Sequence, residues 1–444
     1  MMSATNRFAN CSISQCHRPS VRGGACQICD RPFCCVHDRK EFHTCPSLSE
    51  ISEEEYQQLG YNEISELHQR LDVAELLKRA STLNAGQKCR YESRDSDTTG
   101  FIVGCANFHG RIIFDDQTEW LIRIPRKGFN EYPRQLIEHV IASEFATLKF
   151  LENTQVPAPK AYDFGLASDR DNRIGVDYIL MERIAGRPWD YGDKDKQSVL
   201  ESVADILIEL SKYPFAQAGS LVIEQGDIYI SKTASNRYVH LDAHGPYATD
   251  KECFLDICQQ YLDLIADGQI CPKWPQQAFA FYSIFATHVE EVSPSTNVQD
   301  FFLKHVDDKG DHILLDETGR VTGIIDWQFA QCVPAAEAFG PSYVTADPAR
   351  LQSADAGLTE DDQRLANILR GKGSASLGMM MERDELMRRF RNGISDLDSK
   401  KEAQHILRGL LAVMGRPQPE DIVVWALEVC RQDHRWPSLL SLSG

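Results

Sequence analysis

Half of the cysteines crowd into the first tenth of the chain, and this clustering constrains the fold more than any other feature. Seven of the 14 cysteines fall within the first 45 of 444 residues. This segment shows no sustained hydrophobic period and is too short to bury a core unaided. In a reducing compartment, such a cluster indicates metal ligands rather than disulfides. The sequence therefore predicts a small N-terminal unit that folds around metal ions.

The cysteines and histidines of this segment follow the spacing C-x4-C-x9-C-x2-C-x4-C-x2-H-x5-H-x-C. The eight positions are Cys11, Cys16, Cys26, Cys29, Cys34, His37, His43 and Cys45. Eight sulfur and nitrogen donors complete two tetrahedral zinc sites and leave no coordination position open, so both zinc ions are expected to be structural. Cys35 is not one of these eight positions. An alternative is that Cys35 is the ligand in place of Cys34. His17 lies outside the spacing and is expected on the surface.

Together with the Phe33-Cys34 pair before the C-x2-H step, this spacing resembles the AN1-type zinc finger over about 40 residues. The resemblance implies a cross-braced pairing with four ligands for each zinc ion. One set is Cys11, Cys16, Cys34 and His37, and the other set is Cys26, Cys29, His43 and Cys45. AN1-like fingers commonly accompany proteins of ubiquitin and stress pathways, so by analogy alone we expect a protein partner for the finger.

The chain is acidic, with 65 acidic against 47 basic residues and a net charge of −18. This balance argues against general binding to nucleic acid or to anionic membranes, and the finger lacks the ββα pattern of DNA-reading fingers. No apolar run approaches the ~20 residues that a membrane crossing needs. The N-terminus also lacks the apolar stretch of a secretion signal. We therefore expect a cytoplasmic protein, with a nuclear location left open.

Beyond the finger, hydrophobic spacing predicts a small sheet-rich part followed by a larger helical part. A charge-rich helical stretch over 53–79 comes first and is interpreted as a spacer or docking helix. The strand-like runs are 100–105, 111–114, 120–125 and 178–184. The main helical runs are 133–152, 198–212, 252–266 and 275–291, with further helices after residue 360. One hairpin over 313–315 and 321–325 interrupts the helical part.

The strongest catalytic pattern lies around this hairpin. His305, Asp307 and His312 form an H-x-D-x-x-x-x-H motif, and Asp326 follows the second strand. Phosphoryl transfer needs one carboxylate that orients the attacking hydroxyl and a second that holds Mg²⁺ against the phosphates. A short hairpin can bring both carboxylates to one face of the same cleft. His305 is interpreted as a structural support of the loop.

The hairpin region resembles the catalytic part of aminoglycoside-phosphotransferase and choline-kinase-like enzymes, of the fungal type. With the motifs upstream and downstream of it, the resemblance covers about residues 90–440. The family pattern is H-x-D-x-x-x-x-N, a hairpin and I-D-W. The resemblance implies an α+β, protein-kinase-like fold with a small antiparallel-sheet N-lobe and a mainly helical C-lobe, preceded by the finger. The implied boundaries are 1–47 for the finger, 48–90 for a helical linker, 91–185 for the N-lobe and 186–444 for the C-lobe, with the catalytic hairpin at 301–330.

The resemblance also implies roles for individual residues in binding ATP and Mg²⁺. Asp307 would be the base and Asp326 the main metal ligand, while Arg123 and Glu144 would clamp the phosphates. The remaining nucleotide-site residues are Gly104 and Asn107 in the turn over the phosphates, and Glu182 at the hinge. The acceptor would be a hydroxyl group of a small molecule that the sequence does not identify.

Two positions depart from the family pattern, because His312 stands where the family has a metal-binding Asn and Arg123 stands where it has Lys. Imidazole is a poor ligand for Mg²⁺, so Asp311 could supply the oxygen, and Lys309 could reach the transferred phosphate in catalysis. His312 divides evenly between a metal ligand and a packed histidine. Two interpretations therefore stay open, an active phosphotransferase and a degenerate pseudokinase or adaptor whose finger recruits a protein.

Two groups of side chains late in the chain have simple structural interpretations. The methionines at 379–381, with Met387, are expected to pack in a helix core. The arginines Arg388, Arg389 and Arg391 are expected to form a solvated basic face.

Overall fold

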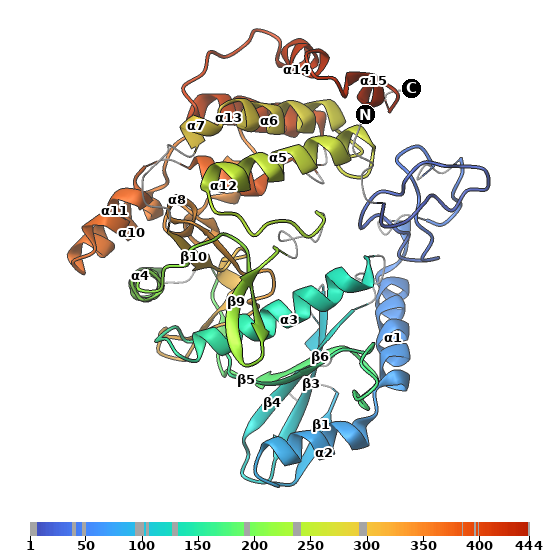
Figure 1. Ribbon diagram of the computed structural model, residues 1–444, viewed down its shortest axis with the longest axis vertical. Helices are drawn as coiled ribbons and strands as arrows, with labels where there is room; N and C mark the ends of the chain where they lie inside the picture. Colours follow the sequence, from blue (N-terminus) through green and yellow to red (C-terminus); the bar gives the residue numbers. More distant parts are fainter. Residues whose placement is uncertain are drawn as a thin grey trace.

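The computed structural model shows two lobes with the N-terminal finger at the side of the junction between them (Figure 1). The described residues are 7–37, 41–46, 50–93, 102–103, 106–126, 132–190, 196–233, 241–292, 300–383, 385–394, 397 and 399–442. The first lobe is built on an antiparallel sheet and the second is mainly helical, as the sequence predicts. None of the described helices is long and apolar enough to cross a membrane.

A six-stranded antiparallel sheet forms the smaller lobe. Its strand order is β1-β3-β4-β6-β5, and β2 pairs with β3. The strands are β1 (Cys89–Glu92), β2 (Ile102–Val103), β3 (Asn107–Phe114), β4 (Glu119–Pro125), β5 (Ala161–Gly165) and β6 (Tyr178–Glu182). The predicted strands over 111–114, 120–125 and 178–184 are confirmed, whereas β1 and β5 were not predicted.

Alternating side chains give this sheet two apolar faces. Ile122 and Leu180 face α1 (Glu53–Arg70) and α2 (Val73–Leu83) and share one core with them. Ile179 and Met181 face the opposite way and share a second core with α3 (Arg134–Leu151). The helices of the 48–90 segment therefore pack on the sheet and contribute Ile64, Leu67, Leu71, Leu76 and Ala80 to its core.

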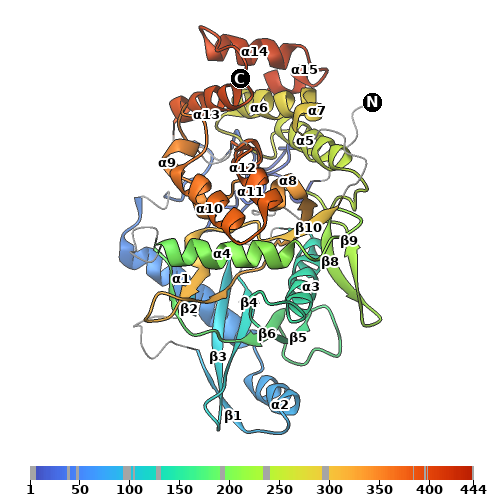
Figure 2. The ribbon, with the colours of Figure 1, turned by 90° about the vertical axis from the view of Figure 1, so that its left-hand side faces the viewer.

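The larger lobe consists of helices with short strands between them (Figure 2). Its helices are α4 (Lys196–Leu210), α5 (Asp250–Ala266), α6 (Pro275–Thr287), α7 (Val289–Val292), α8 (Ala335–Ala338), α9 (Pro348–Leu351), α10 (Glu360–Gly371), α11 (Ala375–Met381), α12 (Leu386–Asn392), α13 (Lys400–Val413), α14 (Ile422–Arg431) and α15 (Trp436–Leu440). Its strands are β7 (Arg187–Pro188), β8 (Ser220–Glu224), β9 (Asp227–Ser231), β10 (Phe301–Lys304), β11 (Ile313–Leu315), β12 (Val321–Ile324) and β13 (Gln331–Pro334).

The predicted hairpin is confirmed as β11 and β12, which pair antiparallel, with β7 as a third strand. The turn of this hairpin contains a residue with positive φ, and glycine adopts this conformation readily: the φ of Gly319 is 77°. The segment before the hairpin is held at its other end by β10, which pairs with β13. Residues 305–312 therefore run between two anchored strands and end in a single 3₁₀ turn, η3 (Gly310–His312).

The expectation of a solvated arginine face is wrong. Arg388 and Arg389 are only 3% and 2% exposed. Arg388 donates to Asp362 from Nη1 at 2.9 Å and to Glu385 from Nη2 at 2.9 Å. Arg391 binds Glu337 from Nε at 2.7 Å. Arg388 and Arg389 are buried, and the Arg391 side chain is only 14% exposed. Asp362 and Glu337 pair with Arg388 and Arg391 from 26 and 54 residues away in the sequence, and local charge patterns do not reveal such partners.

The methionines divide between the core and the surface. Met381 and Met387 are buried, as predicted, whereas Met379 is 63% exposed. Only the methionines on the helix faces that are turned toward the interior of the lobe are therefore buried.

We predict that Arg388→Ala destabilises the protein by about 3–5 kcal/mol, because it leaves the buried carboxylates of Asp362 and Glu385 without their shared cation. Urea unfolding followed by circular dichroism measures the loss. Arg364→Ala is the matched control, since Arg364 forms an ion pair with Asp361 while 43% of its side chain is exposed. That change should cost less than about 1 kcal/mol. Equal effects of the two substitutions would contradict the prediction.

Candidate functional site

Three charged side chains from different parts of the fold meet between the lobes. Arg123 is on β4, Glu144 is on α3, and Asp326 follows β12. The Arg123 guanidinium forms an ion pair with Glu144 through Nη1 and binds Asp326 Oδ1 through Nη2 at 2.5 Å. The side chains of Arg123 and Glu144 are only 5% and 4% exposed. The planar guanidinium group of arginine can donate to two carboxylates at once in a fixed geometry, whereas the ammonium group of lysine is a point charge without a preferred plane.

The surroundings shift the pKa values of both carboxylates. Burial raises the pKa of Glu144 to about 7, and the nearby charge of Asp326 adds to this increase against the opposing effect of Arg123. Burial also acts to raise the pKa of Asp326, but the charge of Arg123, with smaller contributions from the neighbouring His312 and His305, outweighs burial and holds the pKa below its usual value. Asp326 is therefore the carboxylate that stays ionised and is able to hold a cation.

The backbone at Asp326 is also unusual, with a positive φ of 64°. A non-glycine residue in this region is uncommon, and such strain persists only where the surrounding structure enforces it. Here the neighbouring residues enforce it, because Ile325 N–H binds His312 O at 2.9 Å and Trp327 donates from Nε1 to Ile324 O at 2.9 Å.

Gln328 joins the cluster, and the sequence analysis missed it. Its Oε1 accepts from Arg123 Nη2 at 2.9 Å and from Asn107 Nδ2 at 3.0 Å. Asn107, expected in the turn over the phosphates, is therefore held beside Arg123 at the start of β3. Gly104 lies outside the described residues. The sequence offers one indication that Gln328 belongs to the site, which is its position two residues after Asp326. Its residue type alone does not predict hydrogen bonds with Arg123 and Asn107.

The segment between β10 and β11 brings Asp307 and His312 to the same cluster. His312 Nδ1 lies 2.8 Å from the backbone oxygen of Asp307. Because a carbonyl oxygen can only accept, Nδ1 has the proton, and in the neutral ring Nε2 is the free acceptor. That Nε2 lies 3.4 Å from Asp326 Oδ2. The structure therefore points a nitrogen of His312 at the carboxylate that the sequence assigns to metal binding.

Lys309 and Asp311 lie at the rim of this segment. Lys309 Nζ is 3.7 Å from Asp307 Oδ2 and 3.3 Å from Asp311 Oδ2. The Asp311 side chain is 57% exposed, and none of the ion pairs found among the described residues joins it to Arg123 or Asp326. Lys309 is thus close to Asp307, whereas Asp311 lies on the solvent side of Lys309.

His305 has a structural role in the segment 305–312, as predicted. Its Nε2 donates to the backbone oxygen of Ile325 at 2.9 Å, and its ring packs edge-on against Trp327 with centroids 4.8 Å apart. Burial lowers the pKa of His305, so the ring stays neutral. The contact with Ile325 ties this segment to the residue that precedes Asp326.

Glu182 is at the end of β6, where the chain leaves the sheet. Its carboxylate accepts from the backbone N–H of Lys160 at 3.2 Å. The ion pairs and hydrogen bonds found among the described residues do not join it to the charged cluster around Arg123, and its role at a hinge stays a prediction.

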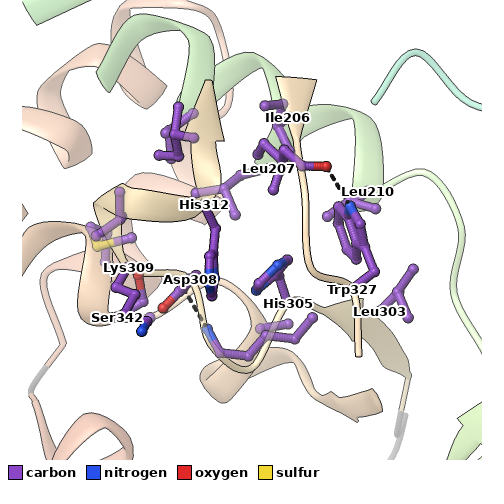
Figure 3. Close-up of a pocket in the computed structure, with 18 residues that line it drawn as sticks. Ile206, Leu207, Leu210, Leu303, His305, Asp308, Lys309, His312, Trp327 and Ser342 are labelled. Atoms are coloured by element: carbon purple, nitrogen blue, oxygen red, sulfur yellow. Dashed lines mark hydrogen bonds and ion pairs between the residues drawn. The ribbon is translucent and has the colours of Figure 1, made fainter. Parts of the chain in front are cut away.

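A small cavity lies behind the segment, between α4 and residues 304–312 (Figure 3). Its volume is about 60 Å³, and α4 supplies a largely apolar wall that includes Ile206, Leu207 and Leu210. His312 lines this cavity, and its Nε2 also approaches Asp326.

The eight predicted ligands of the finger gather into two groups. The first group is Cys11, Cys16, Cys34 and His37, and the second is Cys26, Cys29, His43 and Cys45. Within each group the donor atoms lie within 4.8 Å of one another. This is the cross-braced division that the resemblance to AN1-type fingers implies, and Cys35 belongs to neither group. A tetrahedral set of three thiols and one imidazole fits a structural zinc ion.

Cysteine sulfurs and histidine nitrogens approach each other closely in both groups. Cys11 Sγ lies 3.3 Å from His37 Nδ1, and Cys29 Sγ lies 3.5 Å from His43 Nε2. Phe33 is fully buried beside His43, with ring centroids 4.3 Å apart. His17, outside the ligand spacing, is exposed as predicted. Among the described residues of this unit, few apolar side chains other than Phe33 and the cysteines are buried. Metal ligation would supply the stability that so small a core lacks.

This chain is similar to a family profile and to several solved structures. The profile of the phosphotransferase enzyme family (APH) matches residues 111–371. Among solved structures, the ethanolamine kinase of Plasmodium vivax is 12% identical and covers 80% of this chain and 82% of its own, with a TM-score of 0.42. The macrolide 2'-phosphotransferase of Brachybacterium faecium is 14% identical and covers 84% of this chain and 97% of its own, with a TM-score of 0.35. A search of curated proteins gave no significant match.

Proposed function

We propose that this chain, which belongs to the phosphotransferase enzyme family, transfers the γ-phosphoryl group of ATP to a hydroxyl group of a small molecule. The observation that supports this most directly is the meeting of Arg123, Glu144 and Asp326 beside the segment with Asp307. Phosphoryl transfer relies on positioning and electrostatic stabilisation, and this arrangement supplies both.

In this proposal Asp307 accepts the proton of the acceptor hydroxyl. The hydroxyl oxygen then forms a bond to the γ-phosphorus while the bond to the ADP oxygen breaks. Lys309, whose Nζ lies 3.7 Å from Asp307 Oδ2, would neutralise charge on the transferred group. Arg123 would hold the α- and β-phosphates, and Glu144 would fix the direction of its guanidinium. Gly104, Asn107 and Glu182 would contribute to the nucleotide pocket.

A divalent metal ion would be held by Asp326 and would neutralise the developing charge on the phosphates. The second ligand position belongs to His312, whose Nε2 points toward Asp326. Asp311 is less suited, because it is 57% exposed and bonded to Lys309 rather than directed at Asp326. Imidazole suits transition-metal ions better than Mg²⁺. We therefore propose that Mn²⁺ supports nucleotide binding better than Mg²⁺.

For the finger, we propose two structural zinc ions and the AN1 type. The support is the division of the eight ligands into two groups of four with thiol and imidazole donors. The alternative function, a pseudokinase or adaptor, would retain the cleft without transfer and use the finger to recruit a protein. It is favoured by the departures at Arg123 and His312, and the nucleotide experiment below distinguishes the two.

We predict that ATP with a divalent metal raises the melting temperature of the wild-type protein and not that of Asp326→Ala. A ligand at ~100 times its dissociation constant adds about 2.7 kcal/mol to the folded state, which thermal unfolding detects. Glu317→Gln is the matched control, because it removes an exposed carboxylate on the turn of the same hairpin. No shift in the wild-type protein at saturating nucleotide, or an equal shift in Asp326→Ala, would refute the nucleotide site.

We predict that the wild-type protein binds ATP more tightly with Mn²⁺ than with Mg²⁺, and that His312→Asn reverses this order. The reason is the replacement of an imidazole nitrogen by an amide oxygen, which Mg²⁺ prefers. Isothermal titration of ATP at fixed metal concentration measures both affinities. If the ratio of the two affinities is the same in both proteins, His312 is not a metal ligand.

We predict that the purified protein contains two zinc ions per chain, since each group of four donors completes one tetrahedral site. Elemental analysis measures the content. Cys29→Ser should lower it toward one, whereas Cys35→Ser should leave it at two because Cys35 belongs to neither group. A wild-type content well below two would contradict the assignment.

A further inference from the structure

The finger is not separated from the rest of the molecule, because one of its loops enters the main body. The segment 17–25 joins the two metal-ligand groups, with Cys16 in one group and Cys26 in the other. Arg22 lies on this segment and its side chain is fully buried. Since both ends of the segment are ligands, occupancy of both metal sites would fix the position from which Arg22 projects.

Arg22 binds the C-lobe just beyond the end of α5. Its backbone N–H donates to the Gln269 carbonyl oxygen at 2.8 Å, and its Nε donates to Gln269 Oε1 at 2.9 Å. Its Nη1 also pairs with Asp242 Oδ1 at 3.2 Å. Gln269 is completely buried, so these hydrogen bonds are shielded from water. A buried arginine with hydrogen-bonded partners of this kind is costly to leave unpaired, which makes the contact specific.

The same arginine connects to the start of α3 through an aromatic pair. The Arg22 guanidinium lies over the ring of Phe8, 3.7 Å from its centroid. Phe8 packs edge-on against Tyr132, with ring centroids 5.4 Å apart. Tyr132 is 8% exposed and immediately precedes Pro133, the N-cap residue of α3. The finger thus contacts the residue that immediately precedes the N-cap of the helix on which Glu144 is located.

Two further contacts extend this interface along the end of α5. Arg7 Nη2 lies 3.5 Å from Asp267 Oδ1. Cys35 and Leu442 both pack closely against Gly268. Cys35 Sγ lies only 3.4 Å from the position that a Cβ atom on Gly268 would occupy. The cysteine that the ligand pattern left over is therefore part of the surface that meets the C-lobe.

We infer that this surface of the finger, formed by Phe8, Arg22 and Cys35, is a docking surface for the chain's own phosphotransferase unit. Through it, metal binding in the finger holds the start of α3 against the end of α5. The inference builds on the proposed function in one respect, because α3 positions Glu144 against Arg123. A protein partner that the finger recruited would have to use a different surface.

Hydrogen–deuterium exchange of the full-length, zinc-loaded protein tests this inference. In Arg22→Ala, amide exchange should speed up about tenfold or more in two segments, 132–140 and 262–270, because the hydrogen bonds of a charged donor are lost. Arg18→Ala is the matched control, since Arg18 is an exposed arginine on the same connecting segment. Phe8→Ala, which retains the polar contacts, should affect 132–140 more than 262–270. Zinc content is measured for each variant and should remain that of the wild-type protein.

Removal of zinc from the wild-type protein with a chelator should reproduce the exchange pattern of Arg22→Ala. The inference is overturned if Arg22→Ala retains its zinc and both segments exchange as in Arg18→Ala, or if zinc removal affects only the finger. If Arg22→Ala loses zinc, Phe8→Ala decides the question. None of these measurements uses nucleotide, so a failure of the proposed activity would leave the exchange result standing, and the reverse also holds.

Discussion

The arrangement of the cleft depends on one buried cation, Arg123. It lies on β4 of the N-lobe and binds Glu144 on α3 as well as Asp326 and Gln328 in the C-lobe. A buried guanidinium is unfavourable unless its donors are paired, so the three partners are held where the fork requires them. The geometry of this single side chain therefore links the sheet, the helix α3 and the hairpin β11–β12, in addition to the apolar core that packs α3 on the sheet.

A second buried arginine, Arg22, constrains the same helix from outside the cleft. Arg123 reaches α3 through Glu144, near the middle of the helix, whereas the finger reaches its start through Phe8 and Tyr132. A rigid helix held at two points can neither slide nor tilt freely. A unit with almost no core of its own can therefore matter to the cleft, because one cation directs its docking and the proposed metal ligation would supply its stability.

Local features could be predicted from the sequence, whereas distant partners could not. The finger ligands follow from spacing, because all eight lie within 35 residues, and the hairpin follows from two short apolar runs around a glycine turn. Gln328 meets Asn107 across 221 positions, and Arg22 meets Gln269 across 247. Such pairs form only when the finger and the two lobes assemble. The same reason accounts for the wrong expectation at Arg388, whose carboxylate Asp362 belongs to another helix.

The charges of the cleft bear on whether it is active or degenerate. Arg123 supplies one positive charge against the two carboxylates of Glu144 and Asp326, and His312 turns an acceptor nitrogen toward Asp326 in its neutral form. A proton can compensate the surplus negative charge, which agrees with the pKa of about 7 that burial and Asp326 give Glu144. A divalent cation at Asp326 can compensate it as well. The two carboxylates differ in their access to solvent, because the Asp326 side chain is 36% exposed whereas that of Glu144 is 4% exposed. A cation that enters from solvent would therefore meet Asp326, and a proton would be held by the buried Glu144.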